Sequence, residues 1–335
     1  MSLADLAAIV VLTGLIAYTL FAGADFGGGV WTALAGGPRA ERQREALFRA
    51  IGPVWETNHV WLILVIVTLF TVFPSAFADL FIALLVPLVI ALVGIVFRGA
   101  AFAFRHFIMG TGTGLPATET VFSVASFVAP LSMGMAIGAI AGGHITIENG
   151  VVTSGLFGTW LRPFPIICGL MTVTTCAVLA AFYMTTRTTG DLREDFRVHG
   201  LAASLMLGVL TSAAIPVAYW WSEPLWDGLL EPGALVLMGG AVTLGIGSLA
   251  VLWYRRFGLA PPIAAGAVTL VISAWAVAQY PYLIVPNGRV SDVAAESGTI
   301  ALFLIVLAVG ASLLIPSLLL LYRTLGTGET RAPGI

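Results

Sequence analysis

The chain has 335 residues, of which 59% are hydrophobic and only 10% are charged, and its formal net charge is −2. Soluble domains carry roughly 25% charged residues, so this composition excludes an ordinary soluble fold and indicates an integral membrane protein. No basic patch supports nucleic acid as a partner, so the expected surroundings are the lipid bilayer and no nucleic acid is expected.

Nine apolar segments follow one another along the chain, and each is long enough to cross about 30 Å of hydrocarbon. The predicted helices lie near residues 6–34, 51–73, 77–105, 119–142, 164–186, 198–221, 233–254, 261–279 and 298–322. Connections rich in Gly, Pro or charged residues separate them, which is typical of loops. We therefore predict an all-α integral membrane protein, a single membrane domain over residues 1–335 with nine transmembrane helices. The first is expected to be a retained helix, because it lacks the charged start of a signal peptide.

The longest outer connection follows the fourth predicted helix and divides the helices into two groups. Residues 1–143 would form a first four-helix bundle, residues 164–280 a second one, and residues 297–323 a peripheral ninth helix. With the N-terminus outside, thirteen of the fifteen arginines fall on the inner side, and only Arg162 and Arg289 fall outside. The positive-inside rule therefore predicts an outer N-terminus and a cytoplasmic C-terminus.

Three ionisable residues lie inside predicted helices, where such side chains are rare and by default indicate function. Asp25, Glu56 and Arg98 belong to the first, second and third helices, and all lie roughly 7–10 Å below the inner boundary. Glu56 shares a helix face with His59, and Asn58 lies between them in the sequence. A carboxyl group in an apolar setting exchanges a proton readily near neutrality, and an imidazole one turn deeper would continue a relay.

Structural roles for the same residues are the alternative. Asp25 or Glu56 would pair with Arg98, or the Arg98 side chain would reach the inner interface instead. Asn58 would bond a neighbouring helix. His59 is the only histidine well inside a predicted helix, and a membrane haem often takes two such ligands. Neither a haem nor a metal ion is therefore expected in this chain alone.

Glycines and acids near helix ends have simpler interpretations. Gly23 and Gly27 form a GxxxG pattern, which predicts close helix contact and would press Asp25 against the second helix. Glu119 lies near the start of the fourth predicted helix and Asp79 near the start of the third. The helix dipole favours acids at these positions, so capping is the predicted role of both.

Three stretches together point to a known family. G-A-D-F-G-G-G in the first helix, I-G-P-V-W-E-T-N-H-V-W-L-I in the second and F-R-G-A-A-F-A-F-R in the third resemble subunit II of the cytochrome bd quinol oxidases. The motif resemblance covers about residues 20–106, and beyond them only helix number and hydropathy agree.

The resemblance carries over residue by residue. The acid of the family's W-D-G-N pattern falls on Glu56, and the acid of its first helix falls on Asp25. Three further residues match as they stand: Trp55, Asn58 and Trp61. Two neighbours depart from the pattern, because Thr57 replaces Gly and His59 stands where Glu or Gln is more familiar. Together with Glu in place of Asp, these departures imply a divergent branch with different haem content or quinone preference.

The resemblance implies a non-haem subunit of a membrane-bound quinol:oxygen oxidoreductase in the bacterial cytoplasmic (inner) membrane. A haem-bearing subunit I would hold haem b and haem d, or b-type haem only in a divergent branch, and would form a heterodimer with this chain. A small single-helix subunit joins some complexes, and a structural quinone is associated with some members. The complex would use quinol to reduce O2 to water and generate a proton gradient. This chain would supply a cytoplasmic proton path and oxygen access, without a catalytic centre of its own.

The expected site is thus a proton path with supporting side chains. The path residues are Glu56, Asp25, His59 and Asn58, and the supporting residues are Trp55, Trp61 and Arg98. Two other functions would also explain intramembrane polar residues: a proton-coupled membrane transporter, and a purely structural scaffold whose polar cluster only holds helices together. Transporters often contain inverted repeats and paired broken helices, and neither pattern is evident in this sequence.

Overall fold

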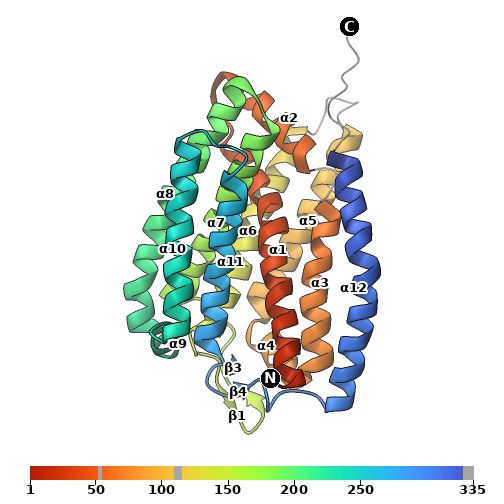
Figure 1. Ribbon diagram of the computed structural model, residues 1–335, viewed down its shortest axis with the longest axis vertical. Coiled ribbons are helices and arrows are strands. Elements are labelled where there is room, and N and C mark those ends of the chain that lie inside the picture. The colour runs from red at the N-terminus through yellow and green to blue at the C-terminus, as the bar shows by residue number, and fades with distance from the viewer. Residues whose placement is uncertain (52–54, 109–114, 327–335) are drawn as a thin grey trace.

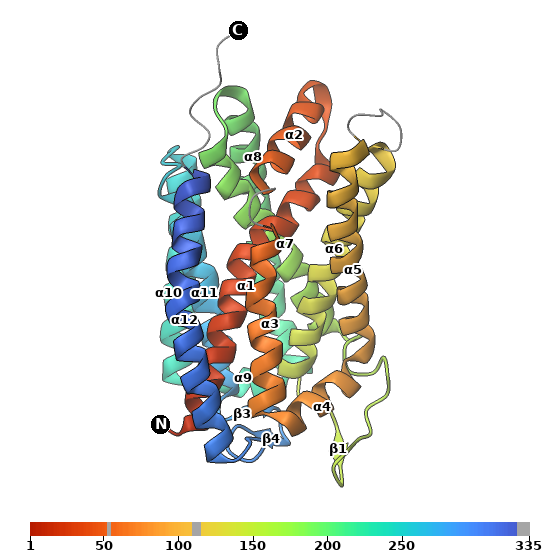
Figure 2. The ribbon, with the colours of Figure 1, turned by 90° about the vertical axis from the view of Figure 1, so that its right-hand side faces the viewer.

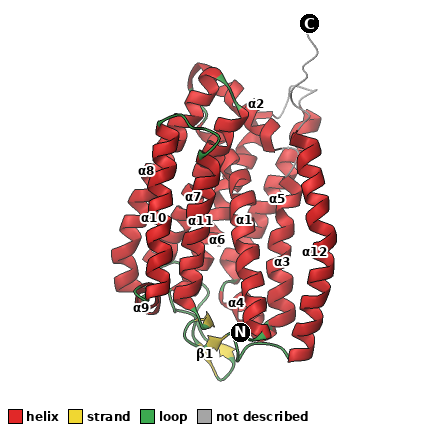
Figure 3. Cartoon of the chain, in the orientation of Figure 1, coloured by secondary structure: helices red, strands yellow, loops and turns green. Residues whose placement is uncertain are grey.

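The computed structural model describes residues 1–51, 55–108 and 115–326, and its long helices run side by side along the long axis of the molecule (Figure 1). These residues are mainly helical, with small hairpins near the end that holds the N-terminus (Figure 3). Eight described helices are long and apolar enough to cross a membrane, and counting the bent pair α3–α4 as one span gives nine. The prediction of an all-α multi-pass membrane protein is confirmed. Its orientation and its division into two bundles and a ninth helix stay predictions.

The elements follow one another in a simple order along the chain. The helices are α1 (Leu3–Leu34), the short 3-10 helix η1 (Gly37–Arg39), α2 (Ala40–Ile51), α3 (Trp55–Val72), α4 (Pro74–Ala83), α5 (Leu85–Ile108), α6 (Leu115–Ala141), α7 (Pro163–Arg187), α8 (Gly190–Trp221), α9 (Glu223–Leu229), α10 (Pro232–Trp253), α11 (Ala260–Gln279) and α12 (Ser297–Gly326). The hairpins are β1 (Ile147–Glu148) with β2 (Val151–Val152) and β3 (Tyr282–Ile284) with β4 (Gly288–Arg289), both antiparallel.

Helix α1 is the central element, since it packs against α3, α6 and α7. It begins with a capping box, in which Ser2 and Asp5 each accept a hydrogen bond from the other's backbone amide. A β-carbon on Gly27 would lie 1.9 Å from the carbonyl oxygen of Cys176 on α7, so only glycine fits there. The GxxxG pattern does permit close helix contact, but the partner of Gly27 is α7. The prediction that it presses Asp25 against the second helix is therefore wrong.

The second and third predicted spans meet at a sharp bend. The chain turns by 119° between α3 and α4, and a second break at Leu84 divides the predicted helix 77–105 between α4 and α5. Pro74 begins α4, because its fixed φ and missing N–H suit the first turn of a helix. Asp79 lies within this short helix, which corrects its predicted place at the start of a span. Near the bend, the Val72 carbonyl of α3 accepts a hydrogen bond from the Ala295 amide at 2.7 Å.

Helix α2 occupies a segment that the sequence predicts as a loop. Its residues are good helix formers, and the ion pairs Arg49–Glu45 and Arg44–Glu41 link successive turns. In Figure 2, α2 lies at the end of the molecule away from the N-terminus. Under the predicted orientation this is the cytoplasmic end, which we call the α2 end below.

Apolar side chains cover the outside of the helix assembly. Val236 on α10, Leu313 on α12 and Leu205 on α8 are 75%, 71% and 68% exposed. Water disfavours such surfaces, whereas hydrocarbon is as apolar as they are, so these faces fit a lipid environment. Buried polar side chains are therefore to be sought where α1 meets its neighbours.

Candidate functional site

A buried ion pair joins α1 to α5. Asp25 and Arg98 have side chains only 4% and 1% exposed, and Arg98 Nη2 lies 2.6 Å from Asp25 Oδ1. Arg98 also donates to the Asp25 carbonyl oxygen at 3.2 Å and, through Nε, to Ser126 Oγ on α6 at 3.0 Å. Its guanidinium lies over the rings of Phe26 and Phe122, at 5.0 Å and 4.9 Å from their centroids. Arg98 is therefore held inside the helix assembly and does not reach the interface.

Such a pair is stable only because each charge has a nearby partner. An isolated charge in an apolar interior is very costly, and the loss of either partner leaves the other uncompensated. The glycines beside Asp25 bring α7 close, so the space around the pair is filled by helix backbone and apolar side chains. The arrangement ties three helices, α1, α5 and α6, together at one level.

The polar residues at the start of α3 divide between two faces. Asn58 is 2% exposed and its Nδ2 donates to the carbonyl oxygen of Phe21 on α1 at 3.3 Å. Trp61 stacks on the Phe21 ring, with centroids 6.2 Å apart. His59 is partly buried, and its ring lies 6.0 Å from that of Tyr18. All three residues thus face α1.

Glu56 points the other way. Its side chain is exposed in the isolated chain, and it forms no ion pair or hydrogen bond with any described residue. At 100° per residue, Glu56 and Asn58 are separated by about 200° around α3, so they lie on nearly opposite sides. The expected cluster of Asp25, Glu56 and Arg98 at one depth therefore contains Asp25 and Arg98 only. The side chain of Trp55 lies outside the described residues.

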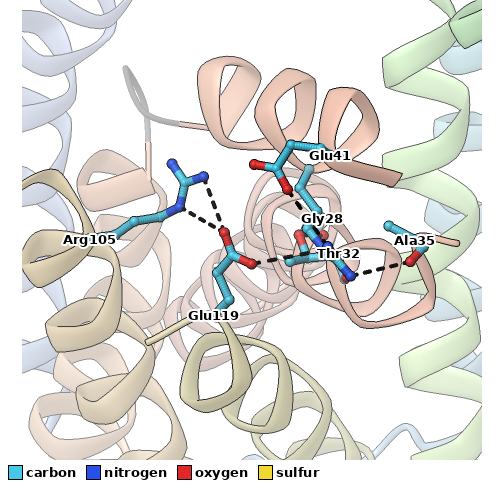
Figure 4. A network of polar contacts seen from close by, with 7 residues as sticks. Gly28, Thr32, Ala35, Glu41, Arg105 and Glu119 are labelled. Carbon is cyan, nitrogen blue, oxygen red and sulfur yellow. Dashed lines mark hydrogen bonds and ion pairs between the residues drawn. The ribbon is translucent and has the colours of Figure 1, made fainter. Parts of the chain in front are cut away.

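A second charged cluster lies nearer the α2 end, and Figure 4 shows it from close by. The carboxylate of Glu119 on α6 accepts from Nε and Nη2 of Arg105 on α5, at 3.4 Å and 3.3 Å. Its other oxygen lies 3.9 Å from Nε of Arg44 on α2, which also donates to the carbonyl oxygens of Thr32 and Ala35 at the end of α1. Helix α6 starts at Leu115, so Glu119 lies in its second turn and bridges helices. The capping prediction for Glu119 is wrong.

Sequence reasoning missed Arg105 as a site residue, although a signal was present. Arg98 and Arg105 are seven residues apart, which places them on the same face of α5 two turns apart. Each contacts aromatic rings as well as an acid, and the Arg105 guanidinium lies 3.8 Å from the centroid of Phe48 on α2. These two arginines thus lie at successive levels on one buried face of α5, with Arg98 in the membrane interior and Arg105 nearer the α2 end.

A third polar group surrounds a cavity of about 260 Å³ between the α1–α2 connection and the start of α8. Asp195 accepts from Nε of Arg39 at 2.8 Å and from Nε2 of Gln43 at 2.8 Å, and this strong pairing raises the pKa of Arg39 further. The ring of His199 also lines the cavity and stacks on Trp31, with centroids 4.6 Å apart. This group could not be predicted from the sequence, because Arg39 and Gln43 lie about 150 residues from Asp195.

The described histidines are spread over separate places. His59 lies on α3, His106 on α5, His144 between α6 and β1, and His199 on α8. Among the described residues, no group of three or more His, Cys, Asp or Glu side chains could hold a metal ion. The recorded ring contact of His59 is with a tyrosine and not with a second imidazole. These donor sets do not fit a haem with two axial histidines, and no step below places one in this chain.

The fold and these buried charges define a multi-pass, α-helical membrane protein with acid–base pairs between its helices. The chain belongs to the family cytochrome bd terminal oxidase subunit II, which matches residues 3–325. The resemblance seen in three short motifs thus extends over nearly the whole chain.

Curated relatives and a solved structure agree with this family. Cytochrome bd-I ubiquinol oxidase subunit 2 of Escherichia coli is 29% identical over 195 residues, which is 57% of this chain and 51% of that protein. Cytochrome bd ubiquinol oxidase subunit 2 of Bacillus subtilis is 28% identical over 217 residues, covering 65% and 62% of the two chains. The matched part therefore spans about half to three fifths of these relatives. The bd oxidase structure from Geobacillus thermodenitrificans shares the fold, with a TM-score of 0.76, 22% identity and coverage of 98% and 100%.

Proposed function

We propose that the chain is the non-haem subunit of a membrane-bound bd-type quinol:oxygen oxidoreductase of the bacterial cytoplasmic membrane. A haem-bearing subunit I, carrying haem b and haem d or b-type haem only, is its partner. Quinol and O2 are the substrates of the assembled complex. Support comes from the family match and from relatives whose names describe subunit 2 of cytochrome bd ubiquinol oxidases.

The observation that carries the proposal is the outward direction of Glu56. Below it on α3, Ile63, Val67 and Phe70 are 57%, 44% and 63% exposed, and their spacing of 7, 11 and 14 residues from Glu56 follows one helix face. A carboxyl group at one end of an apolar stripe in a membrane protein marks a functional surface more than a packing one. Subunit I covers this stripe, and Glu56 then lies at the contact between the two subunits.

In this arrangement Glu56 receives protons from the cytoplasm and delivers them toward the haem subunit. A carboxyl group is able to accept a proton from water on one side and to release it on the other. Asn58 and Trp61 hold this part of α3 against Phe21, and the Asp25–Arg98 pair fixes the α1 side at a similar level. His59 continues the path on the α1 side. The N-terminus lies outside, as the arginine distribution predicts.

The proposal is tested with Glu56→Gln in the assembled complex. Glutamine keeps the size and polarity of the side chain but cannot carry a proton, so quinol oxidation and oxygen consumption should fall while the haem spectra stay intact. Glu223→Gln provides a matched control, because Glu223 is an exposed glutamate at the start of α9, away from the α2 end. Unchanged turnover with intact haems would overturn the proton role. Loss of haem absorbance would instead show that Glu56 holds the complex together.

A further inference from the structure

Three buried polar atoms on α1 and α3 have no hydrogen-bond partner among the residues that the structure describes. They are Oη of Tyr18, Oδ2 of Asp25 and Nδ1 of His59. Tyr18 is only 7% exposed. Buried hydroxyl, carboxylate and imidazole atoms are nearly always hydrogen-bonded to protein or ordered water, and hydrocarbon offers no substitute. Two of these atoms, Tyr18 Oη and His59 Nδ1, belong to rings that face each other across the α1–α3 contact, which points to a ligand between these helices.

The backbone places these atoms in a line. Tyr18 and Asp25 are seven residues apart on α1, so they share a face and are separated by about 10 Å along the helix axis. On α3, His59 faces the same contact, with its ring 6.0 Å from that of Tyr18 and inclined by 44°. The adjacent Asn58 is bonded to Phe21 of α1, which fixes the register of the two helices at this level.

The other charged group at this contact is already engaged. Arg98 donates to Oδ1 of Asp25 and to Ser126, which leaves Oδ2 as the free acceptor of the carboxylate. The side chains around Tyr18 are apolar, including Ala22, Phe26 and Met133. Among the described residues, no donor or acceptor meets Tyr18 Oη or His59 Nδ1, so both atoms are open to a small polar ligand.

We propose that an ordered water molecule is bound between Tyr18 Oη and His59 Nδ1, and that this hydrated pair extends the Glu56 path toward the middle of the membrane. Water suits the site because it both donates and accepts, and a buried water typically has two to four polar partners. A proton received by the imidazole at one nitrogen is released from the other to the water, which passes on one of its own protons. One proton enters and one leaves, and the tyrosine hydroxyl orients the water. The transport part of this inference rests on the proposed function.

The test is Tyr18→Phe in the intact complex, followed by difference infrared spectroscopy and by turnover. Removing Oη should abolish a water O–H band that shifts in H2(18)O, lower oxygen consumption several-fold and alter its solvent deuterium isotope effect. Haem spectra should be unchanged. Tyr219→Phe is the matched control, since Tyr219 lies on α8 with 57% of its surface exposed.

The outcomes separate this inference from the proposed function. If Tyr18→Phe keeps the water band and the turnover while Glu56→Gln is slow, the hydrated pair is wrong and the Glu56 path stands. If Tyr18→Phe abolishes the band but neither variant slows turnover, the water is present and the proton path is wrong. Should Tyr18→Phe disturb assembly, His59→Gln serves instead, because its amide still binds water but does not titrate. If His59→Gln keeps the water band but slows oxygen consumption, the relay is supported. If oxygen consumption in His59→Gln is normal, the relay is contradicted.

Discussion

Glu56 and Asn58 are two residues apart on α3, yet Asn58 is bonded to the Phe21 carbonyl of α1 and Glu56 faces away from α1 altogether. The two polar residues of one motif therefore have different structural environments. Asn58 fixes the helix in the subunit, and Glu56 is presented to whatever covers the α3 face. A residue's place in a motif says little about its direction, because each step along a helix turns the side chain by about 100°.

Breaking the Asp25–Arg98 pair should strongly destabilise the protein. Asp25→Asn leaves the buried guanidinium without its countercharge, so the free energy of unfolding should fall by about 3–5 kcal/mol. The double variant Asp25→Asn with Arg98→Met should lose much less, because no charge stays buried. Denaturant unfolding of the purified protein measures both. Equal losses in the single and double variants would contradict a paired role.

Adding one methyl group at the α1–α7 contact should also be costly. The β-carbon of Gly27→Ala would overlap the Cys176 carbonyl oxygen, and overpacking of this kind costs about 1–3 kcal/mol. Gly208→Ala on α8 is the matched control, because no atom lies within 4 Å of its added β-carbon. The control should be neutral or slightly stabilising, since alanine is the better helix former. A neutral Gly27→Ala in thermal unfolding would show that the two helices can separate.

Neutralising Glu119 should loosen α2 without affecting the deeper pair. Glu119→Gln removes the charge that Arg105 and Arg44 share, and the expected loss is about 1 kcal/mol, because the carboxylate is still 15% exposed. Hydrogen exchange should rise in α2 and at the end of α1, while the Asp25 region of α1 stays protected. Glu148→Gln is a suitable control, since Glu148 is an exposed glutamate on β1, outside α2 and its contacts. Equal exchange in both variants would argue against the bridge.

Acid should weaken the loop that follows α6. Burial, and secondarily the charge of Arg162, lower the pKa of His144 below its ordinary 6.5, against the opposing effect of its hydrogen bond to the Trp221 carbonyl. A lowered folded pKa means that protonation favours the unfolded state. The stability that neutral His144 gives to the folded protein is therefore present above pH 6.5. It is lost as the pH falls through the pKa of His144 in the folded state. His144→Gln, which can still donate to Trp221, should flatten this part of the dependence of unfolding on pH. An unchanged dependence would contradict the assignment.

The sequence predicted the membrane class, most of the spans and the family, because these depend on hydropathy and local motifs. It also placed Asp25 and Arg98 at one level, since the depth of a residue follows from its count along a helix. It left open which acid pairs with Arg98, because that choice depends on helix rotation about the axis. The contact partner of Gly27 and the bridge made by Glu119 depend on which helices are neighbours, and one chain's hydropathy contains no record of that.

Short polar elements were the other source of error. Helix α2 is rich in charge and was predicted as a loop, although its Arg and Glu side chains pair along the helix. The break at Leu84, which divides the predicted helix 77–105, was missed because α4 and α5 on either side of it are equally apolar. In each case the property that decides the structure is a pairing or a dihedral angle, to which average hydropathy is insensitive.

The hydrogen bond between the Val72 carbonyl and the Ala295 amide gives α3 a fixed reference point far from Glu56. Sixteen residues of helix separate Val72 from Glu56, or about 24 Å. Because a helix has a fixed rise per residue, the position of Val72 determines the position of Glu56 along the membrane normal. The segment before α12, which holds Val72, therefore sets the depth of Glu56 in the membrane. Relatives with insertions in that distant segment should therefore differ in the depth of the acid at this position, even when every residue around it is the same.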